Sequence, residues 1–346
     1  MMNIYYKALE LIEGGQAFAF ATIISEDGST PRSAGSKMLI TENAIYYTIG
    51  GGGSEGDVIR LAREHVLKDK KPLIKTYSLR GTAAADSPFI CGGEIEVLID
   101  YIDPKDPNNG VVFHAAAEAT ADGSTAWLVT QLDANDGAKY PRQFCLSNAK
   151  KGIIGDFEGT GFASDILVSP LRTSIHGETK DGVRFILDPV HTGGSLYIFG
   201  GGHVSLAVAD IARMLEFHIV VIDDRAEFAN KERFPFCETV VLPEFEGMER
   251  FDIDENSYIL IVTRGHAFDR TVLEWALKTD ACYIGMIGSR TKRDTIYSSL
   301  RNQGVAQERI DFVHSPVGIK IGAQTPEEIA VSITAELIEE RAKKLK

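Results

Sequence analysis

Apolar positions in the C-terminal half of the chain form short blocks that alternate with amphipathic stretches. The blocks predict strands and the stretches predict helices: strands near 196–199, 218–222, 239–242, 258–262 and 282–287, and helices near 204–216, 267–278, 290–303 and 326–344. Strands that alternate with helices are typical of a parallel sheet with right-handed crossovers. The pattern therefore predicts a doubly wound α/β domain over residues 191–346.

The N-terminal half has a mixed pattern, which becomes weak between residues 105 and 185. Helices are predicted over 2–13, about 56–68 and near 111–120, and strands over 18–24, 37–40, 94–99, 126–131, 143–146 and 183–187. Because 346 residues exceed what one core usually holds, two domains are expected. We assign residues 1–190 to a mixed α/β domain that precedes the doubly wound one.

A glycine turn follows the first strand of the C-terminal domain. Residues Gly200, Gly201 and Gly202 lead into a helix that starts near His203, and Ser205 stands where the dinucleotide-binding fingerprint has its third glycine. The first two glycines of that fingerprint allow a tight turn and a close approach of pyrophosphate, whereas the third serves packing. The sequence thus predicts a Rossmann-like sheet with a phosphate site at the start of this helix.

Acidic residues end the second strand of this domain, about twenty residues after the glycine turn. Asp223 is placed to accept a hydrogen bond from a ribose hydroxyl, and Asp224 could fill the same role. An acid at this position disfavours a 2′-phosphate. It does not by itself demonstrate NAD binding.

Three further residues follow later strands of the same domain, at the edge where ligands of such sheets bind. His266 could be an acid–base group, an anion contact or a residue of a helix N-terminus. Ser289 is a candidate N-cap, and Arg290 opposes the helix dipole unless it faces an anion. Thr325 and Glu328, in contrast, fit a capping box that requires no ligand.

A second glycine turn, Gly50–Gly53, precedes the predicted helix at 56–68. Gly51 and Gly52 would let an anion approach unpaired backbone N–H groups. The alternative is that Ser54 is an N-cap after a flexible turn. Four consecutive glycines exceed what capping requires, so we favour the binding site.

The four cysteines, Cys91, Cys145, Cys237 and Cys282, are scattered singly. Structural zinc and iron–sulfur clusters need grouped thiolates, so neither is expected, and free thiols are predicted. Cys91 is followed by Gly92 and Gly93 where the chain bends into a strand, which would leave its sulfur accessible. A lone cysteine can equally be a small buried hydrophobe, and spacing alone favours that alternative.

Charge and hydropathy exclude several classes of protein. A net charge of −13 and a pI near 5.1 argue against a general nucleic-acid binder, which needs a basic surface. Lys7, Glu10 and Glu13 would interrupt any secretory signal, and no apolar run reaches the ~18 residues of a membrane span. A cytoplasmic protein without membrane contact is expected.

Taken together, these segments resemble the XdhC/CoxI family, the accessory proteins of xanthine dehydrogenase and related molybdenum hydroxylases. The resemblance covers about residues 30–100 and 190–340. It rests on seven short motifs: Gly-Ser-Thr-Pro-Arg at 28–32, the turn at 50–55, Cys-Gly-Gly at 91–93, Phe-Gly-Gly-Gly-His at 199–203, Asp-Asp-Arg at 223–225, Ile-Gly-Ser-Arg at 287–290, and Ile-Gly-Ala-Gln-Thr-Pro-Glu at 321–327. The four glycines of the second motif depart from the family pattern, and residues 105–185 match nothing assignable.

The resemblance implies a homodimer that binds molybdenum cofactor, as molybdopterin or its dinucleotide form. Such a protein receives the cofactor for sulfuration with the help of a cysteine desulfurase and delivers it to a molybdenum hydroxylase apoenzyme. The family also implicates the cysteine of the Cys-Gly-Gly motif in holding the cofactor, which transfers to Cys91 and reverses the buried-hydrophobe alternative. A soft thiolate is a reasonable molybdenum contact.

Our first hypothesis is therefore a non-catalytic cofactor carrier and insertion chaperone. The cofactor phosphate would lie over Gly200–Gly202, Arg290 or His266 would complete the anion site, and Cys91 would approach the metal end from the first domain. The alternative is an NAD(P)-dependent oxidoreductase with an atypical N-terminal substrate domain, with Asp223 on the ribose and His266 as the acid–base group. The chain is not itself a xanthine dehydrogenase, because two [2Fe–2S] clusters need eight cysteines and it has four.

Overall fold

The computed structural model describes residues 3–30, 32–79, 93–132, 144–148, 152–155, 174–178, 184–190 and 193–343. The chain divides into two compact units, residues 1–191 and 192–346, called the N-terminal and C-terminal units below. Among the described residues, no helix is long and apolar enough to cross a membrane.

The C-terminal unit is built on a six-stranded parallel sheet with the order β13-β12-β11-β14-β15-β16. Numbered along the chain, this is the order 3-2-1-4-5-6 of the doubly wound dinucleotide-binding fold. The predicted fold class is therefore confirmed. The strands are β11 (Ser195–Phe199), β12 (His218–Asp223), β13 (Glu238–Val241), β14 (Ser257–Ile261), β15 (Tyr283–Met286) and β16 (Val313–His314).

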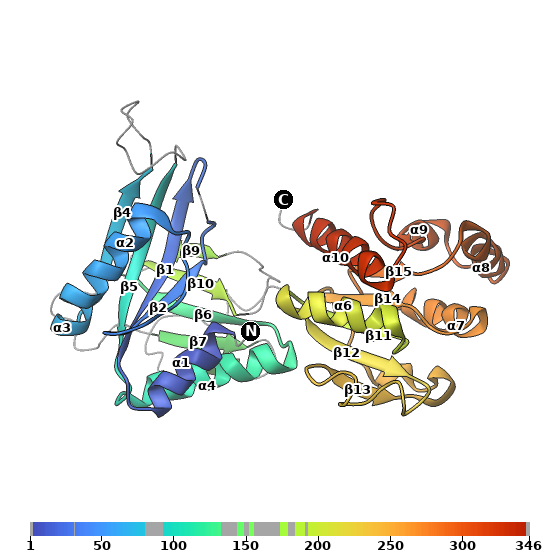
Figure 1. The fold of residues 1–346 in the computed structure, drawn as a ribbon, viewed down its shortest axis with the longest axis horizontal. Coiled ribbons are helices and arrows are strands. Elements are labelled where there is room, and N and C mark those ends of the chain that lie inside the picture. Colours follow the sequence, from blue (N-terminus) through green and yellow to red (C-terminus); the bar gives the residue numbers. More distant parts are fainter. Residues whose placement is uncertain are drawn as a thin grey trace. The chain divides into compact units, whose positions relative to one another are not determined.

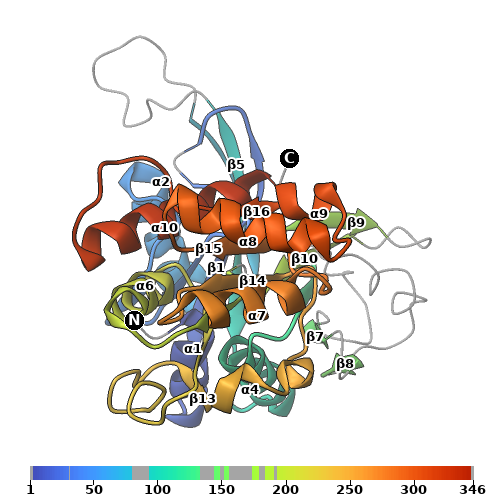
Figure 2. The same ribbon diagram turned by 90° about the vertical axis from the view of Figure 1, so that its right-hand side faces the viewer.

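Helices cover both faces of this parallel sheet (Figure 1). Helices α6 (His203–Met214) and α10 (Pro326–Lys343) lie on one face, and α7 (His266–Ala276) and α8 (Arg290–Asn302) lie on the other, which is turned toward the viewer in Figure 2. Successive residues of a strand point to opposite faces. Accordingly, in β11 Leu196 and Ile198 join the apolar cluster of α6 and α10, whereas Tyr197 and Phe199 join that of α7 and α8.

Two details of the C-terminal unit bear on the sequence predictions. The capping box is confirmed: the Thr325 hydroxyl accepts the Glu328 N–H at 3.2 Å, and the Glu328 carboxylate accepts the N–H groups of Gln324 and Thr325 at 2.7 and 3.2 Å. These backbone hydrogen bonds lower the pKa of Glu328. The two-residue strand β16 and the short helix α9 (Gln307–Asp311) were not predicted, because elements so short carry no periodic pattern.

The described part of the N-terminal unit contains two five-stranded antiparallel sheets, with the orders β3-β2-β1-β5-β4 and β8-β7-β6-β10-β9. The first consists of β1 (Phe18–Asp27), β2 (Lys37–Ile40), β3 (Ile45–Tyr47), β4 (Leu73–Ser78) and β5 (Glu94–Ile102). The second consists of β6 (Ala126–Gln131), β7 (Phe144–Asn148), β8 (Gly152–Ile154), β9 (Ile175–Glu178) and β10 (Arg184–Pro189). Strands β3, β4, β8 and β9 were not predicted.

Helices also cover both faces of the first antiparallel sheet. Helices α1 (Ile4–Glu13) and α4 (Pro107–Asp122) share an apolar cluster with one face, where Phe20 meets the ring of Phe113 edge-on at 5.5 Å. The other face packs against α2 (Gly52–Leu61), which continues through a π-helical turn (Ala62–Val66) into α3 (Leu67–Asp69).

The N-terminal boundary of α2 corrects one prediction. The helix begins at Gly52 rather than near residue 56, so Ser54 lies inside the helix and is not its N-cap. Three successive glycines, Gly50 to Gly52, have positive φ angles that other residues rarely adopt. They turn the chain directly into the helix, before the serine is reached.

Candidate functional site

The glycine turn after β11 has a closed side and an open side. Gly200 has a φ of 113°, and a Cβ there would overlap the carbonyl oxygen of Val262, which follows β14. At Gly202, in contrast, no atom of the described residues beyond its chain neighbours and its own helix backbone lies within 4 Å of the Cβ position. The hydroxyl of the fully buried Ser205 donates to the Gly200 carbonyl oxygen. The serine at the third position of the fingerprint therefore stabilises the turn by a hydrogen bond between helix α6 and Gly200.

Helix α6, which starts after this turn, has features of an anion-binding N-terminus. Its N-cap is Gly202, no side chain of the described residues caps it, and its first turn carries no acidic residue. The first N–H groups of a helix have no partner within the helix, and the helix dipole favours negative charge there. The open side of the turn can therefore accept a phosphate group.

Asp223 meets the glycine turn, as its position at the end of β12 predicts, but its carboxylate is already engaged. It accepts four hydrogen bonds: from the Gly201 N–H at 2.8 Å, and from the Arg225 N–H, Nε and Nη2 at 3.1, 2.9 and 3.2 Å. Burial opposes ionisation of this carboxyl group, yet the hydrogen bonds from Arg225 and Gly201 hold its pKa below the ordinary value. Asp223 thus fastens the turn to the end of β12.

Asp224, the next residue, forms an ion pair that crosses the sheet edge. Its Oδ2 lies 2.5 Å from Nη2 of Arg264, a residue that follows β14. Strands β12 and β14 lie on either side of β11, so the pair passes across the carboxyl end of β11, where the glycine turn begins. The Asp224 side chain is only 9% exposed, and within the described residues its Oδ1 is buried without a hydrogen bond.

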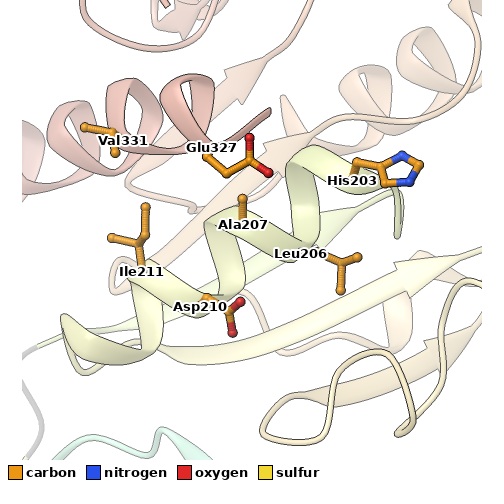
Figure 3. A pocket seen from close by; sticks show the side chains of 7 residues that line it. All are labelled: His203, Leu206, Ala207, Asp210, Ile211, Glu327 and Val331. Atoms are coloured by element: carbon orange, nitrogen blue, oxygen red, sulfur yellow. The ribbon is translucent and has the colours of Figure 1, made fainter. Parts of the chain in front are cut away.

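His203 lines a groove of about 390 Å³ between α6 and α10 (Figure 3). The ring lies at one end of the groove, and Ile211 and Val331 lie at the other end. The side chain is exposed. The remaining lining residues are Leu206, Ala207, Asp210 and Glu327.

His266, Ser289 and Arg290 lie where α7 and α8 begin, along the same sheet edge as the glycine turn. Ser289 is the N-cap of α8, as predicted, because its hydroxyl accepts the Lys292 N–H at 3.2 Å. The side chains of His266 and Arg290 are exposed. In the part of the chain that the structure describes, neither is hydrogen-bonded to the glycine turn.

A buried ion pair that the sequence pattern did not predict lies at this edge, between Asp269 in the first turn of α7 and Lys292 in the first turn of α8. Asp269 is fully buried and also accepts the N–H and hydroxyl of Thr263 at 3.1 and 2.6 Å. A Cβ at Gly288 would lie 2.8 Å from Cδ of Lys292, so the glycine leaves room for the lysine. One signal was available: Lys292 opposes the helix dipole just as Arg290 does.

The glycine turn of the N-terminal unit carries a carboxylate of its own. Oε2 of Glu55 accepts the N–H groups of Ile49 and Gly51, each at 3.0 Å, and the hydroxyl of Thr48 at 2.5 Å. At Gly51 and Gly52 no other atom in the described part of the chain lies within 4 Å of the Cβ position. The donor groups of this turn therefore bind an anion, and in this structure the anion is the carboxylate of Glu55.

Cys91 and Gly92 lie outside the described residues. Gly93 is described and buried, and a Cβ there would lie 2.5 and 2.6 Å from the carbonyl oxygens of Asp27 and Ser29. Gly93 therefore lies directly against the loop that begins the Gly-Ser-Thr-Pro-Arg motif. Two motifs far apart in the sequence meet at one end of the β1–β5 pair.

Comparison with known families assigns both units. Residues 196–337 match the XdhC Rossmann domain, and residues 11–78 match the XdhC and CoxI family. The chain belongs to the XdhC/CoxI family. The N-terminal match of this XdhC/CoxI protein contains Gly51 and Gly52, and the C-terminal match contains the turns after the parallel strands, where the candidate site lies. Residues 91–93 fall between the two matched segments.

Two curated bacterial proteins are similar to this XdhC/CoxI chain over nearly its whole length. The chain is 27% identical over 340 residues to the uncharacterized Escherichia coli protein YqeB, a match that covers 98% of this chain and 46% of YqeB. The chain thus spans about half the length of that relative. It is 24% identical over 352 residues to a Bacillus subtilis protein named as a probable xanthine dehydrogenase subunit, and this match covers 99% of this chain and 98% of that protein.

A solved structure shares the fold of this XdhC/CoxI chain. It is a Bacillus halodurans protein described as a xanthine dehydrogenase, with a TM-score of 0.73 and 24% sequence identity. The match covers 97% of this chain and 96% of the other. At this identity the match establishes the fold and not the activity.

Proposed function

We propose that this protein is an accessory protein of a xanthine dehydrogenase-type molybdenum hydroxylase. It binds molybdenum cofactor, presents it for sulfuration by a cysteine desulfurase, and passes it to the hydroxylase apoenzyme. The observation that carries the proposal is the open, uncapped N-terminus of α6 at Gly202, next to a sheet edge that already holds charged groups. The family, and the name of the Bacillus subtilis relative, support the choice of partner.

The residues of the C-terminal unit fit the phosphate end of such a cofactor. A pterin phosphate needs N–H donors that are free of competing carboxylates, and the first turn of α6 offers them without an acidic side chain. Arg264, whose side chain is half exposed, adds a cation at the same edge. The cofactor supplies the metal and its sulfur ligands, whereas the protein holds its phosphate.

The proposed task requires binding and release rather than bond-making by the protein. The glycine turn is held on one side by hydrogen bonds to Asp223 and Ser205, and it is open on the other, where no described residue lies near the Cβ position of Gly202. A preformed cradle lowers the ordering cost of binding. On its open side Gly202 is partly exposed and His203 is exposed, so a ligand can also leave.

The test is the ligand content of the full-length protein, purified after expression in cells that make molybdenum cofactor. We expect molybdenum and pterin, the latter detected by fluorescence after oxidation, in near-stoichiometric amounts. Stoichiometric nicotinamide cofactor with no pterin would overturn the proposal in favour of an NAD(P)-dependent oxidoreductase. The strand order 3-2-1-4-5-6 makes that second candidate worth the measurement.

Cys91→Ala is expected to lower cofactor retention while leaving the melting temperature nearly unchanged. The family implicates this cysteine in holding the cofactor, and a thiolate is a soft ligand that suits molybdenum. Molybdenum content per chain and thermal unfolding are measured on the same preparations. Cys282→Ala, which removes a partly buried free thiol of the C-terminal unit, is the matched control and should retain the cofactor. Lost stability with full retention in Cys91→Ala would identify a core cysteine instead.

A further inference from the structure

We propose that Asp224 and Arg264 bind the nucleoside phosphate part of the ligand. Asp224 accepts a ribose hydroxyl and Arg264 binds a phosphate oxygen, so the ligand is a nucleotide-bearing form of the cofactor. This inference rests on the proposed function and specifies which form of cofactor the site takes. It is supported by a difference between Asp223 and Asp224, the two neighbouring residues at the end of β12: the carboxylate oxygens of Asp223 already accept hydrogen bonds, whereas one oxygen of Asp224 accepts none from the described residues.

Asp223 has little capacity left for a ligand. Its two oxygens already accept the Gly201 N–H and three N–H groups of Arg225, and the residue is 2% exposed. A ribose hydroxyl could reach it only by displacing the hydrogen bond that fastens the glycine turn. The carboxylate that sequence analysis placed first on the ribose is therefore a positioning residue.

Asp224 has the capacity that Asp223 lacks. Its Oδ2 is paired with Arg264, but its Oδ1 is buried and has no hydrogen bond within the described residues; Nε of Arg225, at 3.6 Å, is too far away. A buried acceptor without a donor is costly, and native proteins rarely leave one unsatisfied. A hydroxyl donor from a ligand would satisfy it.

The position of Asp224 is that of a sugar-binding group. It follows the strand next to β11, on the ligand edge, where the acidic group of doubly wound folds accepts ribose hydroxyls. Arg264 reaches it from the far side of β11, so the two residues meet across the start of the glycine turn. A ligand that places its phosphate on the turn must pass this pair.

The ligand can bind without breaking the ion pair. The Arg264 side chain is 50% exposed, and a guanidinium group carries five N–H donors. One donor can stay on Oδ2 of Asp224 while another donates to a phosphate oxygen, and Oδ1 then accepts the ribose hydroxyl. The buried carboxylate therefore keeps its charged partner when the ligand binds.

This arrangement distinguishes two forms of the cofactor. Molybdopterin itself carries a phosphate but no ribose, so it would leave Oδ1 of Asp224 unsatisfied. A dinucleotide form carries a pyrophosphate joined to a ribose and would engage both the turn and Asp224. The unsatisfied carboxylate oxygen therefore favours the dinucleotide form.

The test uses calorimetric titration of the full-length protein with three probes: ADP, 2′-deoxy-ADP and inorganic pyrophosphate. The wild type should bind ADP about tenfold more tightly than 2′-deoxy-ADP, the effect of one hydrogen bond to a charged group. Asp224→Ala should remove this preference. Its affinity for pyrophosphate should not fall, because Arg264 is released from its partner.

Two further variants keep the result interpretable. Glu227→Gln neutralises a nearby exposed carboxylate and should leave all three affinities unchanged. Asp224→Asn, which preserves the volume of the buried side chain, replaces Asp224→Ala if the alanine variant does not fold. It should likewise reduce the preference for ADP.

Equal binding of ADP and 2′-deoxy-ADP by the wild type, or no binding of either, overturns the inference. An equal loss for all three probes in a folded Asp224→Ala protein overturns it as well. The proposed function fails on a separate measurement, the molybdenum and pterin content. A protein that discriminates the ribose but never holds pterin would keep the site and lose the proposed function.

Discussion

Lys292→Met is expected to lower the free energy of unfolding of the C-terminal unit by about 3–5 kcal/mol, the usual loss when one partner of a buried ion pair is removed. The fully buried carboxylate of Asp269 would lose the ammonium group that faces it. The hydrogen bonds from Thr263 would remain, but they do not neutralise its charge. The turns after β14 and β15, which this pair joins, should loosen together.

The two tryptophans of the chain allow this loss to be measured in the right unit. Trp127 lies in the N-terminal unit, and Trp275 borders the apolar cluster beneath α7 and α8. In a Trp127→Phe background, urea unfolding followed by Trp275 fluorescence therefore reports on the C-terminal unit. Arg290→Met, an exposed change in the same helical turn, is the control and should stay within about 0.5 kcal/mol.

A double variant separates charge from packing. If the buried charge of Asp269 causes the loss, Asp269→Asn combined with Lys292→Met should recover part of it, because no unpaired charge remains. Equal losses in the single and double variants would mean that the lysine contributes packing alone. A Lys292→Met protein as stable as the wild type would contradict the importance of the pair.

The sequence predicted every strand inside the described sheets, but of the strands at their edges it predicted only β13. Central strands such as β11 and β14 are buried on both faces, which gives near-continuous apolar blocks. The missed strands β3, β4, β8, β9 and β16 all lie at an edge of their sheets. An edge strand has one neighbour and buries less, as the half-exposed pattern of β4 shows, so its hydrophobic signal is weak.

In the candidate site, the features that the sequence predicts are those formed by residues close together in the chain. The glycine turn, the N-cap Ser289 and the capping box of α10 depend on residues a few positions apart, so local sequence patterns predict them. Which carboxylate is engaged depends on partners far along the chain: Asp223 meets Gly201, and Asp224 meets Arg264 forty residues later. Such choices are decided by the order of strands in the sheet, which local patterns do not specify.

Gly200→Ala and Gly202→Ala are expected to have opposite effects on stability and binding. At Gly200 a side chain would require an unfavourable backbone conformation, which costs about 1–3 kcal/mol, and its Cβ would also overlap the Val262 carbonyl oxygen. The turn would move away from β14, and the unit should unfold at a markedly lower urea concentration. Trp275 fluorescence in the Trp127→Phe background measures this shift.

At Gly202 the backbone angles suit alanine, with a φ of −74°, and the Cβ would enter open space, so stability should change little. That open space is where a phosphate must approach the N–H groups of α6, and a methyl group there would hold it away. Pyrophosphate affinity, measured by titration, should fall by roughly tenfold or more, the worth of one hydrogen bond to a charged group. A stable Gly202→Ala protein with unchanged pyrophosphate affinity would show that the phosphate does not bind at this turn. A phosphate that did bind there would be held away from the N–H groups of α6 by the methyl group.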